Sequence, residues 1–315
     1  MRRSRVVVLT LLISTLAACA AERDAADTTA GAGDTGAAAS QSAKVGETTG
    51  FDTPESVRYD EELDVFYVAS INGNPSQKDN NGYISRVHAD SLDVATKLAE
   101  GGQRGVTLHA PKGMALRGDT LFVADIDAVR MFNRRTGAPL GSIDLAGQNA
   151  AFLNDVAVGP DGIYVTDTGI RFDAQGNMSP GGSQRVFRIV GRRVTDAIRS
   201  DSLKNPNGIT WDAANNRFII VPFGGTMLFT WEQGQQQPTA LVSGPGQFDG
   251  VEVVNGNVLV SSWADSTVYI AHGGTHMMPL VRNVPAPADI GVDTKRNVLA
   301  VPLFNSGKVE YYRLP

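Results

Sequence analysis

The sequence predicts an all-β fold, a six-bladed β-propeller with a metal site at the mouth of its central channel. Three observations support this: a repeat with a period of roughly forty residues or more, six copies of that repeat, and a composition with 34 glycines and few long charged runs. The 265 residues from Phe51 to Pro315 leave about 44 for each of six units, which is the size of a four-stranded blade.

Each repeat begins with a turn-rich approach and a short apolar strand, followed by a tight turn and a second strand that ends in small or polar residues. The six first strands begin at Pro54-Glu55-Ser56-Val57, Pro111-Lys112-Gly113-Met114, Leu153-Asn154-Asp155-Val156, Pro206-Asn207-Gly208-Ile209, Phe248-Asp249-Gly250-Val251 and Ala288-Asp289-Ile290-Gly291. The second strands are Val65–Val68, Leu121–Ala124, Ile163–Thr166, Phe218–Val221, Val258–Ser261 and Val298–Val301. A third strand follows each of them, so the units align along most of their length.

Two repeats are longer than the others, and the last one is shorter. The excess length predicts surface insertions at residues 72–82 and 171–183, both after a second strand, where a loop can lengthen without disturbing the sheet. Only three strands are evident in the last repeat before Pro315. We therefore expect residues 45–49 to supply its outer strand and to close the ring.

The N-terminal region predicts export and lipid attachment rather than a globular fold. Arg2, Arg3 and Arg5 precede an apolar stretch of signal-peptide length, so residues 1–18 are expected to be a signal peptide. Leu16-Ala17-Ala18-Cys19 resembles the lipobox of bacterial lipoproteins, and the alternative is an ordinary cleavage site beside an unrelated cysteine. Residues 19–50 are then a lipidated cysteine and a flexible linker poor in large apolar side chains, and residues 51–315 the propeller.

These features predict a protein of the bacterial cell envelope, held by Cys19 on the periplasmic side of a membrane. Ala20 after the cysteine favours the outer membrane. The 33 acidic against 28 basic residues exclude nucleic acid as the main partner, because binding to phosphates needs a basic face. A single cysteine excludes an internal disulfide and a thiolate metal cluster.

A polar residue stands near the start of every first strand. In a propeller the first strand is innermost, so these residues should ring the channel at one face: Glu55, Lys112, Asn154, Asn207, Asp249 and Asp289. Carboxylate and amide oxygens suit a hard cation, Ca²⁺ first, with Mg²⁺, Mn²⁺ or Zn²⁺ as further candidates. The alternative is that Asn207-Gly208 and Asp249-Gly250 are only tight-turn dipeptides.

The same positions resemble the senescence marker protein/gluconolactonase family, and also the similar propellers diisopropyl fluorophosphatase and the paraoxonases. The resemblance rests on Thr-Pro-Glu55-Ser-Val, Leu-Asn154-Asp-Val, Pro-Asn207-Gly-Ile-Thr-Trp and Phe-Asp249-Gly-Val, and it covers nearly all of residues 51–315. It implies a metal-dependent hydrolase of lactones or related esters with a small-molecule substrate. Glu55, Asn207 and Asp249 would be metal ligands, and Asn154 a ligand or substrate contact in catalysis.

Further roles follow as hypotheses. Asp249 would act as base or orient a water molecule, with Asp289 as the alternative; Lys112 would attract an acidic substrate or pair with Asp289 or Glu55. Phe223 and Trp263 follow second strands and would contact substrate, or pack between blades. A different class of function also fits a propeller with a polar channel, a non-catalytic ligand-binding or assembly scaffold.

Overall fold

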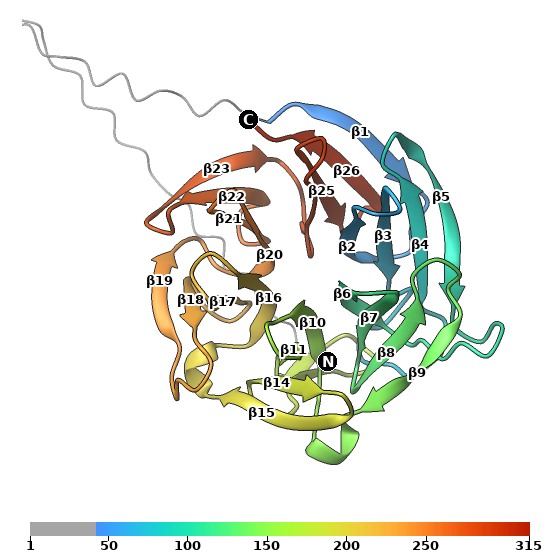
Figure 1. Cartoon of the computed structure of the whole chain (residues 1–315), viewed down its shortest axis with the longest axis horizontal. Helices are drawn as coiled ribbons and strands as arrows, with labels where there is room; N and C mark the ends of the chain where they lie inside the picture. Colours follow the sequence, from blue (N-terminus) through green and yellow to red (C-terminus); the bar gives the residue numbers. More distant parts are fainter. Residues whose placement is uncertain (1–41) are drawn as a thin grey trace, which may run out of the picture. The chain divides into compact units, whose positions relative to one another are not determined.

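The fold is a six-bladed β-propeller, as the sequence predicts (Figure 1). The structure is a computed structural model, and it describes residues 42–315. The predicted signal peptide and Cys19 lie outside the described residues. No helix of the described part is long and apolar enough to cross a membrane.

Each blade is a four-stranded antiparallel sheet whose first strand lies nearest the central axis (Figure 1). The first three blades are β2 (Pro54–Asp60), β3 (Val65–Ser70), β4 (Tyr83–His88) and β5 (Ser91–Glu100); β6 (Pro111–Arg117), β7 (Thr120–Asp125), β8 (Ala128–Asn133) and β9 (Pro139–Asp144); and β10 (Leu153–Val158), β11 (Ile163–Asp167), β14 (Arg185–Val190) and β15 (Arg193–Arg199). The next two are β16 (Pro206–Asp212), β17 (Arg217–Pro222), β18 (Met227–Trp231) and β19 (Thr239–Ser243); and β20 (Phe248–Val254), β21 (Asn257–Ser262), β22 (Thr267–His272) and β23 (His276–Arg282).

The sixth blade joins both ends of the described chain. It consists of β24 (Gly291–Asp293), β25 (Val298–Leu303), β26 (Lys308–Arg313) and, as its outer strand, β1 (Lys44–Thr49). Antiparallel pairing of β1 with β26 confirms the closing strand expected at residues 45–49. The sequence placed the start of the domain at Phe51, but β1 belongs to the last blade, so the folded domain begins before that residue.

The hydrophobic core is divided into clusters that lie between neighbouring blades. One such cluster joins Tyr67 and Ile84 of the first blade to Leu121 and Phe132 of the second. Because a blade packs against a neighbour on each face, its second strand is apolar on both sides, and every residue of β3 and β25 is buried. This explains the continuous apolar runs that revealed the repeat.

The two predicted insertions are present. Residues 71–82 form an irregular loop between β3 and β4, and a short hairpin, β12 (Ile170–Phe172) and β13 (Met178–Pro180), stands between β11 and β14. The rest of the fold also contains two 3₁₀ turns, η1 (Ala146–Gln148) and η2 (Asp201–Leu203).

Candidate functional site

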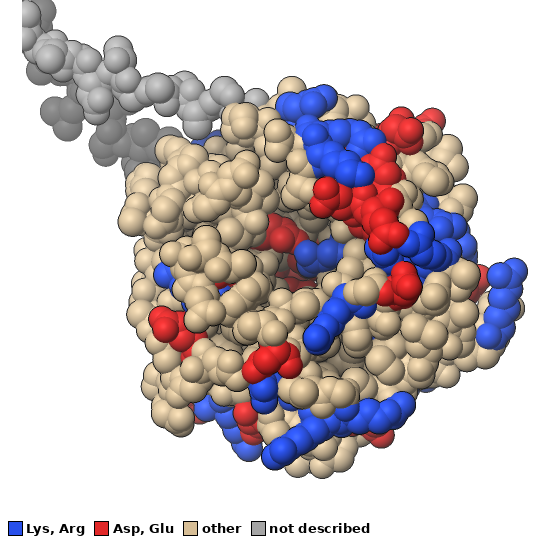
Figure 2. Space-filling model, in the orientation of Figure 1, with Lys and Arg blue, Asp and Glu red and all other residues tan. Residues whose placement is uncertain are grey.

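Five of the six predicted channel residues line one cavity of about 400 Å³. All five are the second residue of an innermost strand and are at most 5% exposed: Glu55, Lys112, Asn154, Asn207 and Asp249. We call this set the ring. Figure 2 shows one face of the propeller, which is hollowed at its centre and has both acidic and basic side chains inside the hollow.

A β-bulge positions each ring residue. In all five blades the register between the first and second strands shifts next to the ring position, for example between Leu153 and Val156 and between Phe248 and Val251. A bulge inserts a residue into the strand and redirects the neighbouring side chains, and bulges are common beside active sites. The bulges therefore direct the ring residues toward the cavity while the strands continue to pair.

The glycines that follow two ring residues serve packing rather than turns. Asn207-Gly208 and Asp249-Gly250 lie inside β16 and β20, not at hairpin tips. A Cβ atom on Gly208 would lie 2.3 Å from the Asp249 carbonyl oxygen, and one on Gly250 would lie 2.4 Å from the Ile290 nitrogen. Because neighbouring innermost strands approach so closely, only glycine fits, and the tight-turn alternative does not hold.

Asp289, the sixth predicted member, lies one residue deeper than the ring. Asp293 pairs with Val298 as Asp60 pairs with Val65, and counting back along each strand places Asp289 level with Ser56. The Ser56 hydroxyl donates a 2.6 Å hydrogen bond to Asp289 Oδ2. Asp289 does not line the cavity, and the strand β24 begins three residues after the predicted start at Ala288.

A buried ionic network lies below the ring. The Arg58 Nε donates to the Met114 carbonyl oxygen at 2.8 Å, and the guanidinium pairs with Glu252. These residues belong to the first, second and fifth blades, so Arg58 spans the channel. Asp155 accepts the Ile209 N–H at 2.8 Å, and burial raises its pKa to about 7 while Arg58 opposes the rise. These ionic groups occupy the channel below the ring, and Arg58 and Glu252 are both partly exposed there.

The ring contains buried carboxylate oxygens without partners. Glu55 Oε2 and Asp249 Oδ1 accept no hydrogen bond from the described residues. Burial, with Asp249 as the next cause, raises the pKa of Glu55 well above its usual value; burial and Asp289 do the same to Asp249. Two such groups at one site are costly unless a cation or a proton compensates them.

The amide side chains complete an oxygen-rich set. Asn154 Nδ2 donates to Thr168 Oγ1 at 3.3 Å, which leaves its Oδ1 without a described partner, and the Asn207 side chain has no hydrogen bond within residues 42–315. Over the same residues, no group of three or more His, Cys, Asp and Glu is arranged to hold a metal. A cation here would therefore need both carboxylates and both amides, and the chemistry of this set fits a hard divalent ion.

Lys112 is a buried cation at the edge of the ring. Its ammonium group donates to the carbonyl oxygens of Pro75 at 3.1 Å and Ala110 at 3.0 Å, and it lies 4.3 Å from the centre of the Phe152 ring. Burial lowers its pKa to about 8, against the attraction of Glu55. Among the described residues it forms no ion pair, so the predicted pairing with Glu55 or Asp289 is absent.

Aromatic side chains form one wall of the cavity. Phe223, Trp263 and Phe304 each follow a second strand; the centres of the Phe223 and Trp263 rings are 5.7 Å apart and those of Trp263 and Phe304 5.2 Å. All three line the cavity. The structure thus brings the predicted pair Phe223 and Trp263 to the ring.

The remainder of the cavity wall was not identified from the sequence. Its residues come largely from the two insertions and share apolar side chains: Ile71, Pro75, Ile170, Phe172 and Met178. The available signal was a few apolar residues in otherwise polar, glycine-rich loops, and the sequence does not show that the two loops meet over one channel.

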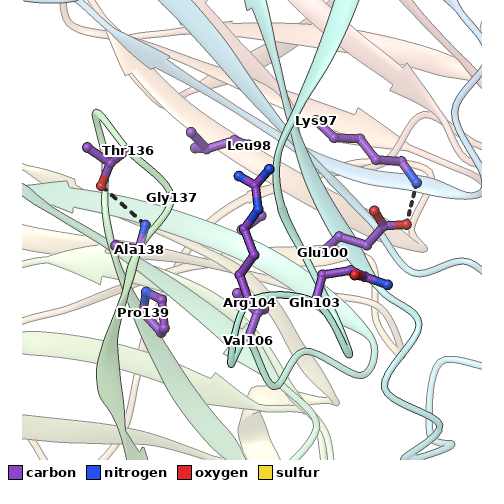
Figure 3. Close-up of a pocket in the computed structure, with 11 residues that line it drawn as sticks. Lys97, Leu98, Glu100, Gln103, Arg104, Val106, Thr136, Gly137, Ala138 and Pro139 are labelled. Atoms are coloured by element: carbon purple, nitrogen blue, oxygen red, sulfur yellow. Dashed lines mark hydrogen bonds and ion pairs between the residues drawn. The ribbon is translucent and has the colours of Figure 1, made fainter.

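A second cavity, of about 350 Å³, lies on the outer side of the first two blades (Figure 3). Its charged groups are Lys97, Glu100 and Arg104, and Lys97 and Glu100 pair with each other at 2.6 Å. These groups are not deeply buried, and the ring lies elsewhere in the molecule. The candidate site is therefore the cavity at the ring.

The comparisons with known proteins support the fold. No protein-family model matches the chain, and no curated protein has significant sequence similarity to it. A gluconolactonase structure from Xanthomonas campestris has a TM-score of 0.62 at 15% identity, over 85% of this chain and 88% of that one. The chain has a gluconolactonase-like propeller fold.

Other solved structures share the propeller. A luciferin-regenerating enzyme has a TM-score of 0.63 at 12% identity, over 84% of this chain and 92% of that one. A chain of a nidogen/laminin complex has a TM-score of 0.57 at 17% identity, over 74% of this chain and 81% of that one. Enzymes and a protein found in a binding complex are thus similar to this gluconolactonase-like propeller, and its function must be argued from its own site.

Proposed function

We propose that the domain is a metal-dependent hydrolase of lactones or related esters that acts at the ring. The observation that carries this proposal is the pair of unpartnered, buried carboxylate oxygens on Glu55 and Asp249, two residues that line the cavity. The amides of Asn154 and Asn207 lie in the same ring. A scaffold has no need of this costly arrangement.

Glu55, Asn154, Asn207 and Asp249 would hold the ion, with Ca²⁺ the first candidate and Mg²⁺, Mn²⁺ or Zn²⁺ to be tested. When bound, the ion would supply Lewis-acid polarisation of the substrate carbonyl. The two carboxylates balance a divalent charge, and the neutral amides add ligands without adding charge.

Asp249 is the proposed base or water-orienting group. Its Oδ1 accepts no regular hydrogen bond within residues 42–315, and a pKa that burial raises despite the nearby Trp263 N–H makes this carboxylate a stronger base than an exposed aspartate. Asp289 is a weaker candidate because it lies below the ring and already accepts the Ser56 hydroxyl. Asn154 would orient the substrate or serve as a ligand.

Lys112 would bind the substrate. Two carbonyl oxygens occupy two of its three N–H groups, so one remains for a substrate oxygen. Its charge also suits a substrate that carries a carboxylate.

Calorimetric titration of the chelated chain with the four ions, followed by assays with lactones and phosphotriesters, tests this function. We expect one ion per chain and lactone hydrolysis that Glu55→Gln and Asp249→Asn abolish together with ion binding. A tightly bound ion without turnover would favour a ligand-binding protein, and absence of both would refute the site.

We also propose that Cys19 anchors the protein by lipid to the periplasmic side of the bacterial envelope, with the outer membrane favoured. The support is the lipobox-like Leu16-Ala17-Ala18-Cys19. Cys19→Ser should move the protein from the membrane to the soluble fraction, and an unchanged distribution would contradict the anchor. Separation of inner from outer membranes assigns the destination.

A further inference from the structure

We infer that the cavity selects substrates in which the lactone or ester carries an apolar alkyl, acyl or aryl group, and that it disfavours polyhydroxylated sugar lactones. Turnover of such substrates rests on the proposed function, whereas the class of ligand is a property of the cavity walls. Binding and turnover can therefore be tested separately.

Polar groups are concentrated at the floor of the cavity. The ring supplies its charged and amide side chains, and Asn154 is supported by Thr168. The Thr168 hydroxyl also donates to the Pro206 carbonyl oxygen at 2.8 Å, so its proton is not available to a ligand. This floor suits the one polar end of a substrate.

Apolar side chains surround the space above the floor. One part of the wall consists of Phe223, Trp263 and Phe304, and the Trp263 ring contacts the rings of both phenylalanines. Another part consists of Phe152 and Phe172, whose ring centres are 5.7 Å apart, and the aliphatic and methionine side chains of the insertions complete the wall, with Ile71 in the cluster against which Phe304 packs. A ligand that reaches the ring must contact this wall, since the ring residues are themselves nearly inaccessible.

Few polar side chains interrupt the walls. The cavity lining outside the ring includes the hydroxyls of Thr53 and Thr168 and the indole N–H of Trp263. The Trp263 Nε1 is buried and makes no regular hydrogen bond among the described residues, but it stands close enough to Asp249 to oppose the rise in the pKa of that carboxyl, so the one donor of the aromatic wall lies beside the ring. One donor suits a carbonyl or ring oxygen, whereas several sugar hydroxyls would lose their water contacts without replacement.

The size of the cavity agrees with a lactone or ester that carries an apolar group. About 400 Å³ is within the range of small-molecule sites and exceeds the space that a bare lactone ring fills. Each methylene group buried against such walls should raise affinity by about fourfold until the cavity is full.

The test uses two ligand series and the intact chain. Unsubstituted and alkyl-substituted δ-lactones are compared with glucono-δ-lactone in turnover, and the matching non-hydrolysable δ-lactams are titrated into the chelated protein by tryptophan fluorescence. We expect lactam affinity and kcat/KM to rise by about fourfold per methylene group, with gluconolactone the poorest substrate and its lactam the poorest ligand.

Variants of the cavity wall test which side chains make lactam affinity and kcat/KM depend on alkyl chain length. In Phe172→Ser and Met178→Gln, lactam affinity and kcat/KM should rise less per methylene group than in the native protein. Met178 is 59% exposed, so its replacement leaves the packed core unchanged. Leu140→Gln, on β9 and 49% exposed, is the matched control and should leave the dependence intact.

The outcomes separate the two proposals. Lactam binding that rises with chain length, without turnover of any lactone, would support the ligand class and refute the hydrolase. Turnover of gluconolactone as fast as that of alkyl lactones, or lactam affinity independent of chain length, would overturn the inference and leave the hydrolase standing.

Discussion

The backbone N–H of Phe172 donates a 3.0 Å hydrogen bond to Ser76 Oγ and so joins two insertions that are 96 residues apart in the chain. A second contact, from Asn74 Nδ2 to the Asp173 carbonyl oxygen at 2.7 Å, lies beside it. Lys112 connects the first insertion to the ring through the Pro75 carbonyl oxygen. The cavity wall is therefore one structure assembled from loops of the first and third blades.

Loss of these contacts should loosen the second insertion without unfolding the propeller. Asn74→Ala/Ser76→Ala removes the two hydrogen bonds between the insertions and also the bond from the Ser76 N–H to Asn74 Oδ1 within the first insertion. Because the two bonds between the insertions contribute about 0.5–1.5 kcal/mol each, their loss should increase local opening by roughly fivefold or more. Hydrogen–deuterium exchange over residues 170–181 measures the change.

Ser91→Ala provides the control, because its hydroxyl bonds only to Asp93 on the outer strand of the first blade. It should leave exchange over the hairpin unchanged. Equal exchange in the double variant and the native protein would show that the two insertions do not support each other.

The charge of Asp249 should destabilise the ion-free protein. In chelator, Asp249→Asn should melt at a higher temperature than the native protein, because it removes one of three buried carboxylates that have an oxygen without a partner, on Glu55, Asp249 and Asp289. Ca²⁺ at about 100 times its Kd should raise the native Tm by about 5–10 °C and leave the variant unchanged. Differential scanning calorimetry with and without the ion measures both effects.

Asp90→Asn, at an exposed aspartate, is the matched control and should respond to the ion as the native protein does. A fall in the ion-free Tm of Asp249→Asn would mean that this carboxylate is stabilised in the fold, which would remove the main support for a cation site.

The sequence predicted the ring residues of five blades, but it placed Asp289 of the sixth blade at the wrong depth in the channel. Apolar second strands revealed the repeat because a blade packs on both faces, and the repeat then aligned Glu55, Asn154, Asn207 and Asp249. Asp289 was misplaced by one residue because Pro287 pairs with Leu303 as Pro54 pairs with Ser70, so the bulge of the sixth blade follows Pro287 and Ala288, not Asp289, takes the ring position. A bulge depends on how two strands pair, and the spacing of residues within one strand does not record it.

The cavity walls were partly predictable for a related reason. Phe223 and Trp263 occupy equivalent places in the repeat, so topology alone brings them to the channel. Phe172 and Met178 lie in a hairpin that the other described blades lack. Their position depends on long-range contacts such as that with Ser76, which a periodic pattern cannot show.

Closure of the ring by β1 should account for a large part of the stability. Removal of residues 42–49 would expose the edge of β26 and uncover Val309 and Tyr311, which are fully buried. Each such side chain contributes about 1.5–3 kcal/mol, so the Tm should fall by about 6 °C or more. A chain that lacks residues 24–38 instead, outside the described part, is the control. An unchanged melting curve after removal of β1 would show that five complete blades and the three remaining strands of the sixth blade are as stable as the closed propeller.

The ion cluster between β1 and β26 should make this closure sensitive to acid. Glu310 accepts hydrogen bonds from Lys44 Nζ at 2.8 Å and Lys308 Nζ at 2.6 Å. Burial opposes its ionisation, but the bonds from Lys308, Lys44 and Tyr312 outweigh burial and lower its pKa to about 2, from the ordinary value of 4.5. A lowered pKa stabilises the fold above the unfolded value, and this contribution disappears as the pH falls from about 4.5 to about 2.

Glu310→Gln should therefore lower the Tm by about 3–8 °C at pH 7, with a difference from the native protein that shrinks as the pH approaches 2. Glu100→Gln is the matched control, because Glu100 is paired with Lys97 on the exposed surface and surface pairs contribute little. Thermal melts from pH 7 to pH 2.5 measure the difference. If the two variants behave alike at every pH, the charge of Glu310 does not hold β1 in place, and closure depends on the backbone pairing and the apolar contacts of β26.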